Sequence, residues 1–266
     1  MSNLNGLKVL IRGAGEIASG VAHRLHMAHI KVAMTEIEHP IAVRREVSFC
    51  EAILDGQKEV EGVKGVKVSS IDEIKGAWNK GFIPVIIDPE LKIRYELKPD
   101  VIVDGTIAKR NLGLTKDYAP LVIALGPGFE ADVDCHMVIE TNRGHNLGRI
   151  ITKGSAEPNT GIPGNTAGYT VERVLRAPAD GTFNTSHKIG DMVKAGDKIA
   201  EVKGEDVISQ INGVLRGLIR NGINVHKGLK VGDVDPRGKR EYCYTISDKA
   251  RAVGGSVLEA ILRVYG

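Results

Sequence analysis

The chain has 266 residues, of which 42% are apolar, and 36 lysines and arginines stand against 33 aspartates and glutamates. This composition is typical of a globular protein with one large or two smaller domains, and it excludes a disordered chain or a collagen-like fibre. A formal net charge of +3 and 4% aromatic residues disfavour a nucleic-acid binder with a basic, aromatic face.

The apolar runs are too short to span a bilayer, so we expect no membrane partner. The first residues lack a basic region followed by an apolar core, and we expect no signal peptide. The three cysteines follow no pattern typical of a disulfide framework or a four-thiolate zinc site. The sequence therefore predicts a cytoplasmic protein.

The first elements are a predicted strand over residues 7–11, a glycine turn, and a helix that begins near residue 16. This order of elements gives weight to a G-x-G-x-x-A motif that binds the phosphates of a nucleotide. Gly13 would allow the tight turn, Gly15 the close approach of a pyrophosphate, and Ala18 the packing of the helix near the sheet. The start of the helix would offer N–H groups to the phosphates.

A second predicted strand, residues 30–35, ends at Glu36, which is placed to accept a hydrogen bond from a ribose hydroxyl. Arg44 and Arg45 follow and could instead meet a 2′-phosphate, so NAD and NADP both remain open. The alternative is that the glycines serve only the geometry of the chain.

Further strands are predicted at residues 82–88, 100–104 and 121–125, and a capping-box pattern at Ser70 opens a helix before them. Alternating strands and helices indicate a parallel sheet with helices on both faces. Ligands of such sheets bind beyond the carboxyl ends of the strands, where several polar or glycine-rich segments follow.

The stretch from Asp132 to His136 is a candidate metal or acid–base site. If it is extended, Asp132, Asp134 and His136 share one face and could hold a divalent metal or transfer protons. The alternative is a solvated strand edge. Cys135 would then point to the opposite face, and we expect a buried thiol there rather than a nucleophile.

The next candidates are Glu140, Arg143, His145 and Arg149, in a stretch that Gly144 and Gly148 loosen. The two arginines could clamp an anionic ligand such as a phosphate, or they could belong to a surface ion-pair network. The candidate catalytic residues are Cys135, His136, Glu140 and His145, and the sequence leaves open whether the protein is an enzyme.

Residues 181–234 contain an internal repeat with a period of 32 residues, in which GDMVKAGDKIAEV matches GINVHKGLKVGDV. Two copies of short strands around glycine turns resemble the biotinyl/lipoyl-like β-sandwich. Lys203 lies near the joint of the two copies, but it lacks the flanking residues of a carrier lysine. We therefore expect neither biotin nor lipoate.

The predicted fold class is α/β, with a Rossmann-like parallel sheet domain, a biotinyl/lipoyl-like β-sandwich and a C-terminal helical tail. The expected bounds are 1–168 for the nucleotide-binding domain, 169–246 for the sandwich and 247–266 for the tail. Gly254 and Gly255 are expected to interrupt the helical spacing of this tail.

Several long strings, among them IRGAGEIASGVAHRL, DCHMVIETNRGHNLGR and DVDPRGKREYCYTISDKARAVGGSVLEAI, resemble the YqeB-like maturation proteins of selenium-dependent molybdenum hydroxylases. The resemblance runs from about Leu7 to Leu262. It implies an accessory role toward a molybdenum hydroxylase apoenzyme of the xanthine dehydrogenase type, or toward its cofactor. No established catalytic residues come with it.

The expected cofactor is a nucleotide, either NAD(P) or a molybdopterin nucleotide, with Gly13, Gly15, Ala18, Glu36, Arg143 and Arg149 as candidate binding residues. Two alternatives to the accessory role remain: an NAD(P)-dependent oxidoreductase and a non-catalytic scaffold for hydroxylase assembly. A homodimer is the default expectation for the oligomeric state.

Overall fold

The computed structural model describes residues 4–266, which divide into two compact units. Unit 1 consists of residues 4–40, Val47–Thr160 and Ile246–Gly266, and unit 2 consists of Ile41–Glu46 and Gly161–Thr245. Both units are therefore discontinuous in the sequence. The sequence analysis placed the changes of domain after residues 168 and 246, and it gave no sign of the six-residue excursion at Ile41–Glu46.

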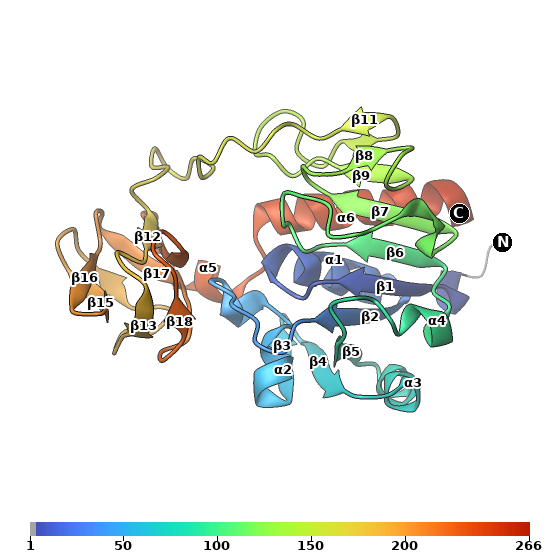
Figure 1. Ribbon diagram of the computed structural model, residues 1–266, viewed down its shortest axis with the longest axis horizontal. Coiled ribbons are helices and arrows are strands. Elements are labelled where there is room, and N and C mark those ends of the chain that lie inside the picture. The colour runs from blue at the N-terminus through green and yellow to red at the C-terminus, as the bar shows by residue number, and fades with distance from the viewer. Residues whose placement is uncertain (1–3) are drawn as a thin grey trace. The chain divides into compact units, whose positions relative to one another are not determined.

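Unit 1 is built on a sheet of nine strands in the order β10-β9-β7-β6-β1-β2-β5-β4-β3 (Figure 1). The strands are β1 (Lys8–Arg12), β2 (Lys31–Glu36), β3 (Gln57–Val60), β4 (Val63–Val68), β5 (Ile83–Ile87), β6 (Val101–Asp104), β7 (Leu121–Leu125), β9 (Met137–Ile139) and β10 (Ile150–Ile151). Strand β3 is antiparallel to β4, and β10 is antiparallel to β9, whereas the seven strands between them are parallel. The strands predicted at residues 30–35, 82–88, 100–104 and 121–125 are confirmed.

The two faces of this sheet are covered by different helices. The helices of unit 1 are α1 (Glu16–Met27), α2 (Glu51–Asp55), α3 (Ile71–Asn79), α4 (Arg94–Leu97) and α6 (Asp248–Tyr265). On one face, Leu10 and Ile102 share a core with Ile74 of α3. The capping box predicted at Ser70 is confirmed, because the Ser70 hydroxyl accepts the N–H of Glu73 at 3.2 Å.

Helices α1 and α6 pack against each other as parallel neighbours (Figure 1). A Cβ at Gly20 would lie 2.7 Å from the Cβ of Ala250, and a Cβ at Gly254 would lie 3.0 Å from the carbonyl oxygen of Gly20. These glycines let the two backbones approach closely. The expected interruption of α6 is wrong, because the helix is continuous over 18 residues.

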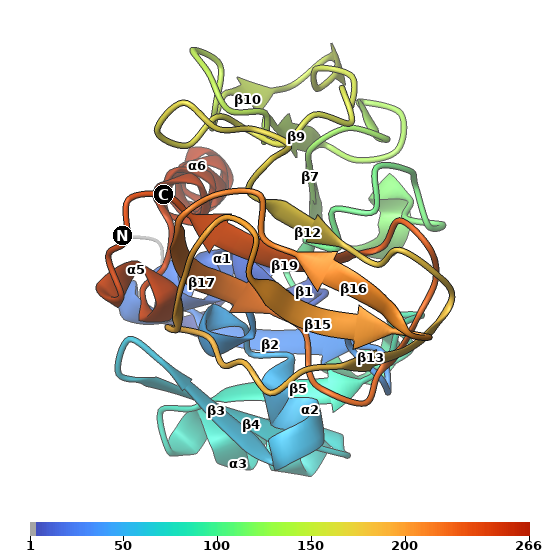
Figure 2. The ribbon, with the colours of Figure 1, turned by 90° about the vertical axis from the view of Figure 1, so that its left-hand side faces the viewer.

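Unit 2 contains two antiparallel sheets of four strands, ordered β12-β19-β17-β14 and β16-β15-β13-β18 (Figure 2). The strands are β12 (Val174–Arg176), β13 (Gly181–Asn184), β14 (Met192–Val193), β15 (Lys198–Val202), β16 (Glu205–Ile208), β17 (Gly213–Leu218), β18 (Asn224–Val225) and β19 (Lys230–Asp235), and a short helix α5 (Glu241–Tyr244) follows. Strands β13, β14 and β15 begin 32 residues before β17, β18 and β19, respectively. Both sheets contribute to one apolar core, which includes Phe183, Leu215 and Val231.

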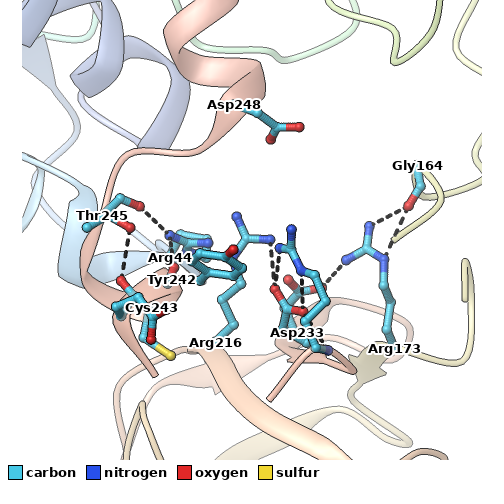
Figure 3. A network of polar contacts seen from close by, with 12 residues as sticks. Arg44, Gly164, Arg173, Arg216, Asp233, Tyr242, Cys243, Thr245 and Asp248 are labelled. Atoms are coloured by element: carbon cyan, nitrogen blue, oxygen red, sulfur yellow. Dashed lines mark hydrogen bonds and ion pairs between the residues drawn. The ribbon is translucent and has the colours of Figure 1, made fainter. Parts of the chain in front are cut away.

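The excursion Ile41–Glu46 is held to unit 2 through backbone and arginine contacts. The N–H of Leu218 donates to the carbonyl of Val43 at 2.8 Å, and Nε of Arg45 donates to the carbonyl of Leu218 at 3.0 Å. The buried Arg44 donates from Nη2 to the carbonyls of Tyr242 and Thr245 at 3.0 and 3.1 Å (Figure 3). Unit 2 thus includes a segment that lies more than 100 residues before the rest of that unit in the sequence.

A network of arginines and aspartates joins other segments of unit 2. Arg173 forms an ion pair with Asp233 and donates to the carbonyl of Gly164, at 2.9 Å from Nη2 (Figure 3). Nη1 of Arg216 lies 3.5 Å from a carboxylate oxygen of Asp235. The side chains of the two arginines and the two aspartates are all buried. They tie the chain that enters unit 2 to the strands of its first sheet.

The predicted fold class is wrong. The large sheet is mixed rather than parallel, and its strands β6, β7 and β9 follow one another without the α-helices of a regular β–α–β alternation. The C-terminal helix is not a tail, because α6 packs on α1 inside unit 1. One observed unit is built on a large mixed sheet and the other on two antiparallel four-stranded sheets, and the two units interrupt one another in the sequence. This differs from the predicted Rossmann-like domain followed by a biotinyl/lipoyl-like domain. Within residues 4–266, no helix is both long and apolar enough to cross a membrane.

Candidate functional site

The candidate site lies at the edge of the large sheet where its parallel strands end. The strand order reverses between β1 and β6: the chain continues from β1 to β2 on one side, and β6 is added on the other. In open α/β sheets, ligands bind outside the carboxyl ends of the strands at such a point. The segments that meet there are the glycine turn after β1, Glu36 at the end of β2, and the loop after β6.

Two glycines at this edge are required by packing. Gly13 has a φ of +87°, and a Cβ there would lie 3.2 Å from the backbone of Thr106. A Cβ at Gly105 would lie 2.8 Å from the Cβ of Ala18. Ala18 is fully buried against that glycine, which is the packing role that the sequence predicted for it. The loop after β6 and the first turn of α1 therefore lie in close contact.

Gly15 differs from both of these glycines. Its φ of −71° and ψ of −176° are open to any residue, and no atom lies within 4 Å of the position that a Cβ would take. Gly15 is the N-cap residue of α1, but it offers no side chain to cap the helix. The first N–H groups of the helix, such as those of Ile17 and Ala18, have no acceptor inside the helix. Neither conformation nor packing explains a glycine here.

Glu36 lies directly beside the glycine turn. One of its carboxylate oxygens accepts the N–H of Ala14 at 2.8 Å, and the other accepts the N–H of Ile37 at 2.8 Å. Burial raises the pKa of the Glu36 carboxyl, whereas the two N–H donors act in the opposite direction. Each carboxylate oxygen can accept more than one hydrogen bond. Glu36 therefore keeps acceptor capacity for a ligand hydroxyl next to Gly15.

The loop after β6 is held by a buried carboxylate. Asp104 accepts the N–H and the hydroxyl of Thr106 at 3.1 and 2.6 Å, and Nη1 of Arg12 lies 3.4 Å from it. Farther along this loop, Ile107 and Lys109 have φ values of +53° and +61°. Such conformations are uncommon for residues other than glycine, above all for a β-branched one, and they cluster at functional sites.

Lys249, in the first turn of α6, is the residue of this edge that the sequence analysis missed. Its side chain is half-buried, and within residues 4–266 its ammonium group makes no hydrogen bond or ion pair. Burial lowers the pKa of this amine, and the nearby cations of Arg143 and Lys109 lower it further. Glu16 and Glu140 act in the opposite direction. Sequence gives only a lysine at the start of an amphipathic helix, which is no sign of a site.

Arg143 and Arg149 do not form the predicted clamp. Arg143 makes a bidentate ion pair with Asp248, with N–O distances of 2.6 and 2.8 Å, and so is held next to the start of α6. Arg149 is exposed and, together with His145, lines an open hollow of about 410 Å³ formed by residues 145–149. Of the two arginines, Arg143 is the one that shares its surroundings with Lys249.

Glu140 holds the backbone of a loop through hydrogen bonds. It is buried, and one oxygen accepts the N–H groups of Thr141 and Asn142, both at 2.7 Å. The other oxygen accepts the N–H of Glu157 at 2.7 Å. Both carboxylate oxygens of Glu140 are thus engaged by the backbone of the loop.

The stretch 132–136 is a turn and not the extended segment on which the predicted metal site depends. Asp132 has a φ of +70° and pairs with Lys116 at 3.0 Å. Asp134 accepts the N–H of Glu130 at 2.8 Å, and Nδ1 of His136 accepts the N–H of Val122 at 2.9 Å. The three side chains thus have separate partners.

No group of three or more His, Cys, Asp or Glu side chains in residues 4–266 is arranged to hold a metal ion. Burial lowers the pKa of His136, and the N–H of Val122 gives its Nδ1 the role of acceptor. The prediction of a buried Cys135 is confirmed, and burial raises the pKa of this thiol to about 12. Such a thiol is not a nucleophile at neutral pH.

No protein-family model matches the chain. Among solved structures, it matches an aspartoacylase family protein from Mesorhizobium loti at 10% identity, over 86% of this chain and 84% of that one, with a TM-score of 0.26. It also matches a succinylglutamate desuccinylase/aspartoacylase from Rhodobacter sphaeroides at 14% identity, over 86% and 85%, with a TM-score of 0.26. TM-scores this low establish no shared fold.

By sequence, the chain is 50% identical over 254 residues to the "Uncharacterized protein YqeB" of Escherichia coli strain K12. The match covers 96% of this chain and 47% of the relative, so the chain spans about half the length of that protein. Over nearly its whole length, this chain is therefore a relative of YqeB.

Proposed function

We propose that unit 1 binds a nucleotide or a nucleotide-containing cofactor at the edge of the sheet formed by the glycine turn, Glu36 and the loop after β6. The proposal rests mainly on the conformation and the open surroundings of Gly15. Its conformation is open to every residue and nothing fills the space in front of it, so a larger side chain would fit the fold. A ligand that approaches the backbone closely is the remaining reason for a glycine at this position.

The rest of the edge suits such a ligand. The first N–H groups of α1 have no acceptor inside the helix, and a helix start favours negative charge such as that of a pyrophosphate. Glu36, bonded to the N–H of Ala14, has acceptor capacity for a ribose hydroxyl. Arg44 and Arg45 donate to backbone carbonyls of unit 2. Their engagement there favours a ligand without a 2′-phosphate, such as NAD or a molybdopterin nucleotide.

In the cell, we propose an accessory role in which the bound cofactor serves the maturation of a selenium-dependent molybdenum hydroxylase. This role rests on the resemblance of the sequence to YqeB-like proteins, of which YqeB itself is a relative of this chain. Candidate acid–base residues are engaged elsewhere: His136 accepts a backbone N–H, and Glu140 accepts three. This favours cofactor handling over an oxidoreductase that uses either residue.

The test is native mass spectrometry of the protein titrated with NAD(H), NADP(H), ATP, CTP and a molybdopterin nucleotide. We expect one nucleotide to bind with clear preference, and Gly15→Val to abolish that binding while the melting temperature changes little. The matched control is Gly76→Val, since Gly76 also has open space where a Cβ would lie but belongs to α3.

Three outcomes would contradict parts of this proposal. Unchanged binding by Gly15→Val would remove the site from the glycine turn. Binding of NAD(P) together with turnover of a small carbonyl compound would favour the oxidoreductase. The absence of any nucleotide binding would leave the scaffold, and tight binding of a hydroxylase apoenzyme by Gly15→Val would then support it.

A further inference from the structure

The excursion Ile41–Glu46 leaves unit 1 and returns to it at the same residue of the glycine turn. On the outgoing side, a carboxylate oxygen of Glu36 accepts the N–H of Ala14 at 2.8 Å. On the returning side, the N–H of Cys50 donates to the carbonyl of Ala14 at 2.9 Å. We call residues 37–49, which lie between these two anchors, the strap. Both ends of the strap are therefore held by Ala14, the middle residue of the glycine turn.

A buried serine fixes the returning end of the strap to the glycine turn. The Ser19 hydroxyl donates to the carbonyl of Ala14 at 2.9 Å and accepts the N–H of Phe49 at 2.8 Å. The ring of Phe49 packs on β4, where a Cβ at Gly65 would lie 2.6 Å from it. Ser19 and Phe49 are both fully buried, and a buried donor left without its acceptor is costly. This end of the strap therefore cannot move without disturbing the turn.

The middle of the strap pairs with the end of β17 in unit 2. The N–H of Leu218 donates to the carbonyl of Val43 at 2.8 Å, and the carbonyl of Leu218 accepts Nε of Arg45 at 3.0 Å. Gly217 allows this close approach, because a Cβ there would lie 2.7 Å from Cγ1 and 2.8 Å from the carbonyl oxygen of Val43. Both backbone polar groups of Leu218 are thus bound by the strap.

The strap has little slack between these two contacts. A 3-10 helix, Arg45–Val47, spans the point at which the chain passes from unit 2 back to unit 1. Val47 and Phe49 are both fully buried. Stiff segments that are packed at both ends can carry energetic coupling between distant sites. A change at Ala14 thus reaches Leu218 through a short and well-packed piece of chain.

We propose that the strap couples the candidate site to unit 2, so that a ligand at the glycine turn stabilises the contact of the strap with β17. The inference rests on the proposed function, because the ligand is the nucleotide bound at the turn. A ligand that bonds to Glu36 and to the first N–H groups of α1 restrains the turn, and with it both anchors of the strap. Such coupling is reciprocal, so loss of the contact with β17 weakens ligand binding by the same factor. Unit 2 is then the part of the protein that responds to the occupied site.

Gly217→Ala tests the coupling from the side of unit 2. The three atoms nearest to the added methyl group all belong to Val43, so the variant displaces the strap. The probe is the tightest binder among NAD(H), NADP(H), ATP, CTP and a molybdopterin nucleotide, measured by calorimetry on the full chain. We expect roughly 5- to 150-fold weaker binding, the usual range for coupled sites. The matched control is Gly232→Ala on β19, whose methyl group meets Leu175 at 2.8 Å instead of the strap, and it should bind normally.

Ser19→Ala tests the strap without any ligand. It removes the bridge between Ala14 and Phe49 in unit 1, and we expect faster hydrogen exchange in the peptide of unit 2 that contains Leu218. Ser256→Ala removes a hydroxyl that donates to the carbonyl of Ala252 within α6, and it should leave this peptide unchanged. In the wild type, saturation with the nucleotide should slow the exchange of the same peptide.

The failure of this inference is distinguishable from that of the proposed function. Equal nucleotide affinity in wild type and Gly217→Ala, or equal weakening in Gly217→Ala and Gly232→Ala, would overturn the inference while the proposed function stands. Exchange at Leu218 that a bound nucleotide does not slow would do the same. If no nucleotide binds, the proposed function fails, and ligand-free Ser19→Ala decides on the strap: unchanged exchange at Leu218 overturns the link, and faster exchange supports it.

Discussion

Gly20 of α1 and Ala250 of α6 lie so close that a Cβ on the glycine would be 2.7 Å from the Cβ of the alanine. This contact sets the distance between the two helices and, through it, the place of Lys249 beside the glycine turn. A glycine inside a helix normally costs stability, because the unfolded chain gains freedom. Here the close crossing of two buried helices explains it.

Gly20→Ala should therefore destabilise the protein, because the added methyl group cannot be accommodated without moving α6. We expect a loss of about 1–3 kcal/mol in the free energy of unfolding, as overpacking of a core typically costs. The matched change is Gly255→Ala on α6, where a Cβ has open space. That variant should gain about 0.5–1 kcal/mol. Urea denaturation of both variants checks the pair, and equal signs would contradict the packing described here.

The lowered pKa of Lys249 predicts a specific pH dependence of stability. In the folded state its pKa lies below the ordinary value of 10.5, so the unfolded chain binds more protons between these two pKa values. The free energy of unfolding therefore rises with pH through that window. Lys249→Met lacks this contribution and should exceed the wild type in stability at pH 7, by an amount that shrinks as the pH approaches 10.5. A pH series of denaturation curves measures it, and a constant difference would contradict the pKa shift.

His136 should matter for stability and not for metal content. Its Nδ1 accepts the N–H of Val122, a fully buried residue of β7. His136→Ala leaves that donor without an acceptor, and we expect a loss of about 1–3 kcal/mol. His136→Asn places an amide oxygen near the position of Nδ1 and should recover most of this loss. Thermal or urea denaturation distinguishes the two, while a drop in bound metal without a loss of stability would revive the metal site.

The cysteines should be unreactive in the native protein. All three thiols are buried, and burial raises the pKa of Cys135 to about 12 and that of Cys243 to about 11. Because the thiolate is the reactive form, a disulfide reagent at pH 8 should release no chromophore from the folded chain. Three equivalents should appear in denaturant. Rapid reaction of one thiol in the folded protein would show that a cysteine is accessible and activated.

Local signals in the sequence predicted much of unit 1. The strand, glycine turn and helix at its start depend on neighbouring residues alone, and β1 and α1 lie where they were expected. The apolar runs of β5, β6 and β7 were equally clear, since strands buried on both faces read as continuous apolar segments. Cys135 was expected to be buried, and it is.

Contacts between distant segments could not be predicted in this way. The alternation from Asp132 to His136 suggested a strand, but Asp132 adopts a left-handed conformation and turns the chain, which leaves Val133 62% exposed. Nothing near Ile41–Glu46 indicates that it belongs to unit 2. Lys249 acquires its surroundings only when α6 packs on α1, after more than 220 residues of intervening chain.

The central claim is that the edge where α1 and α6 begin is a binding site for a phosphate-bearing ligand. Hydrogen–deuterium exchange tests it most directly, in the presence and absence of a saturating amount of the tightest binder among the nucleotides named above. We predict slower exchange in peptides that cover residues 13–19, 104–110 and 247–250, with no change over the strands β13 and β15 of unit 2. Protection confined to unit 2, or none at this edge with the ligand bound, would contradict the account.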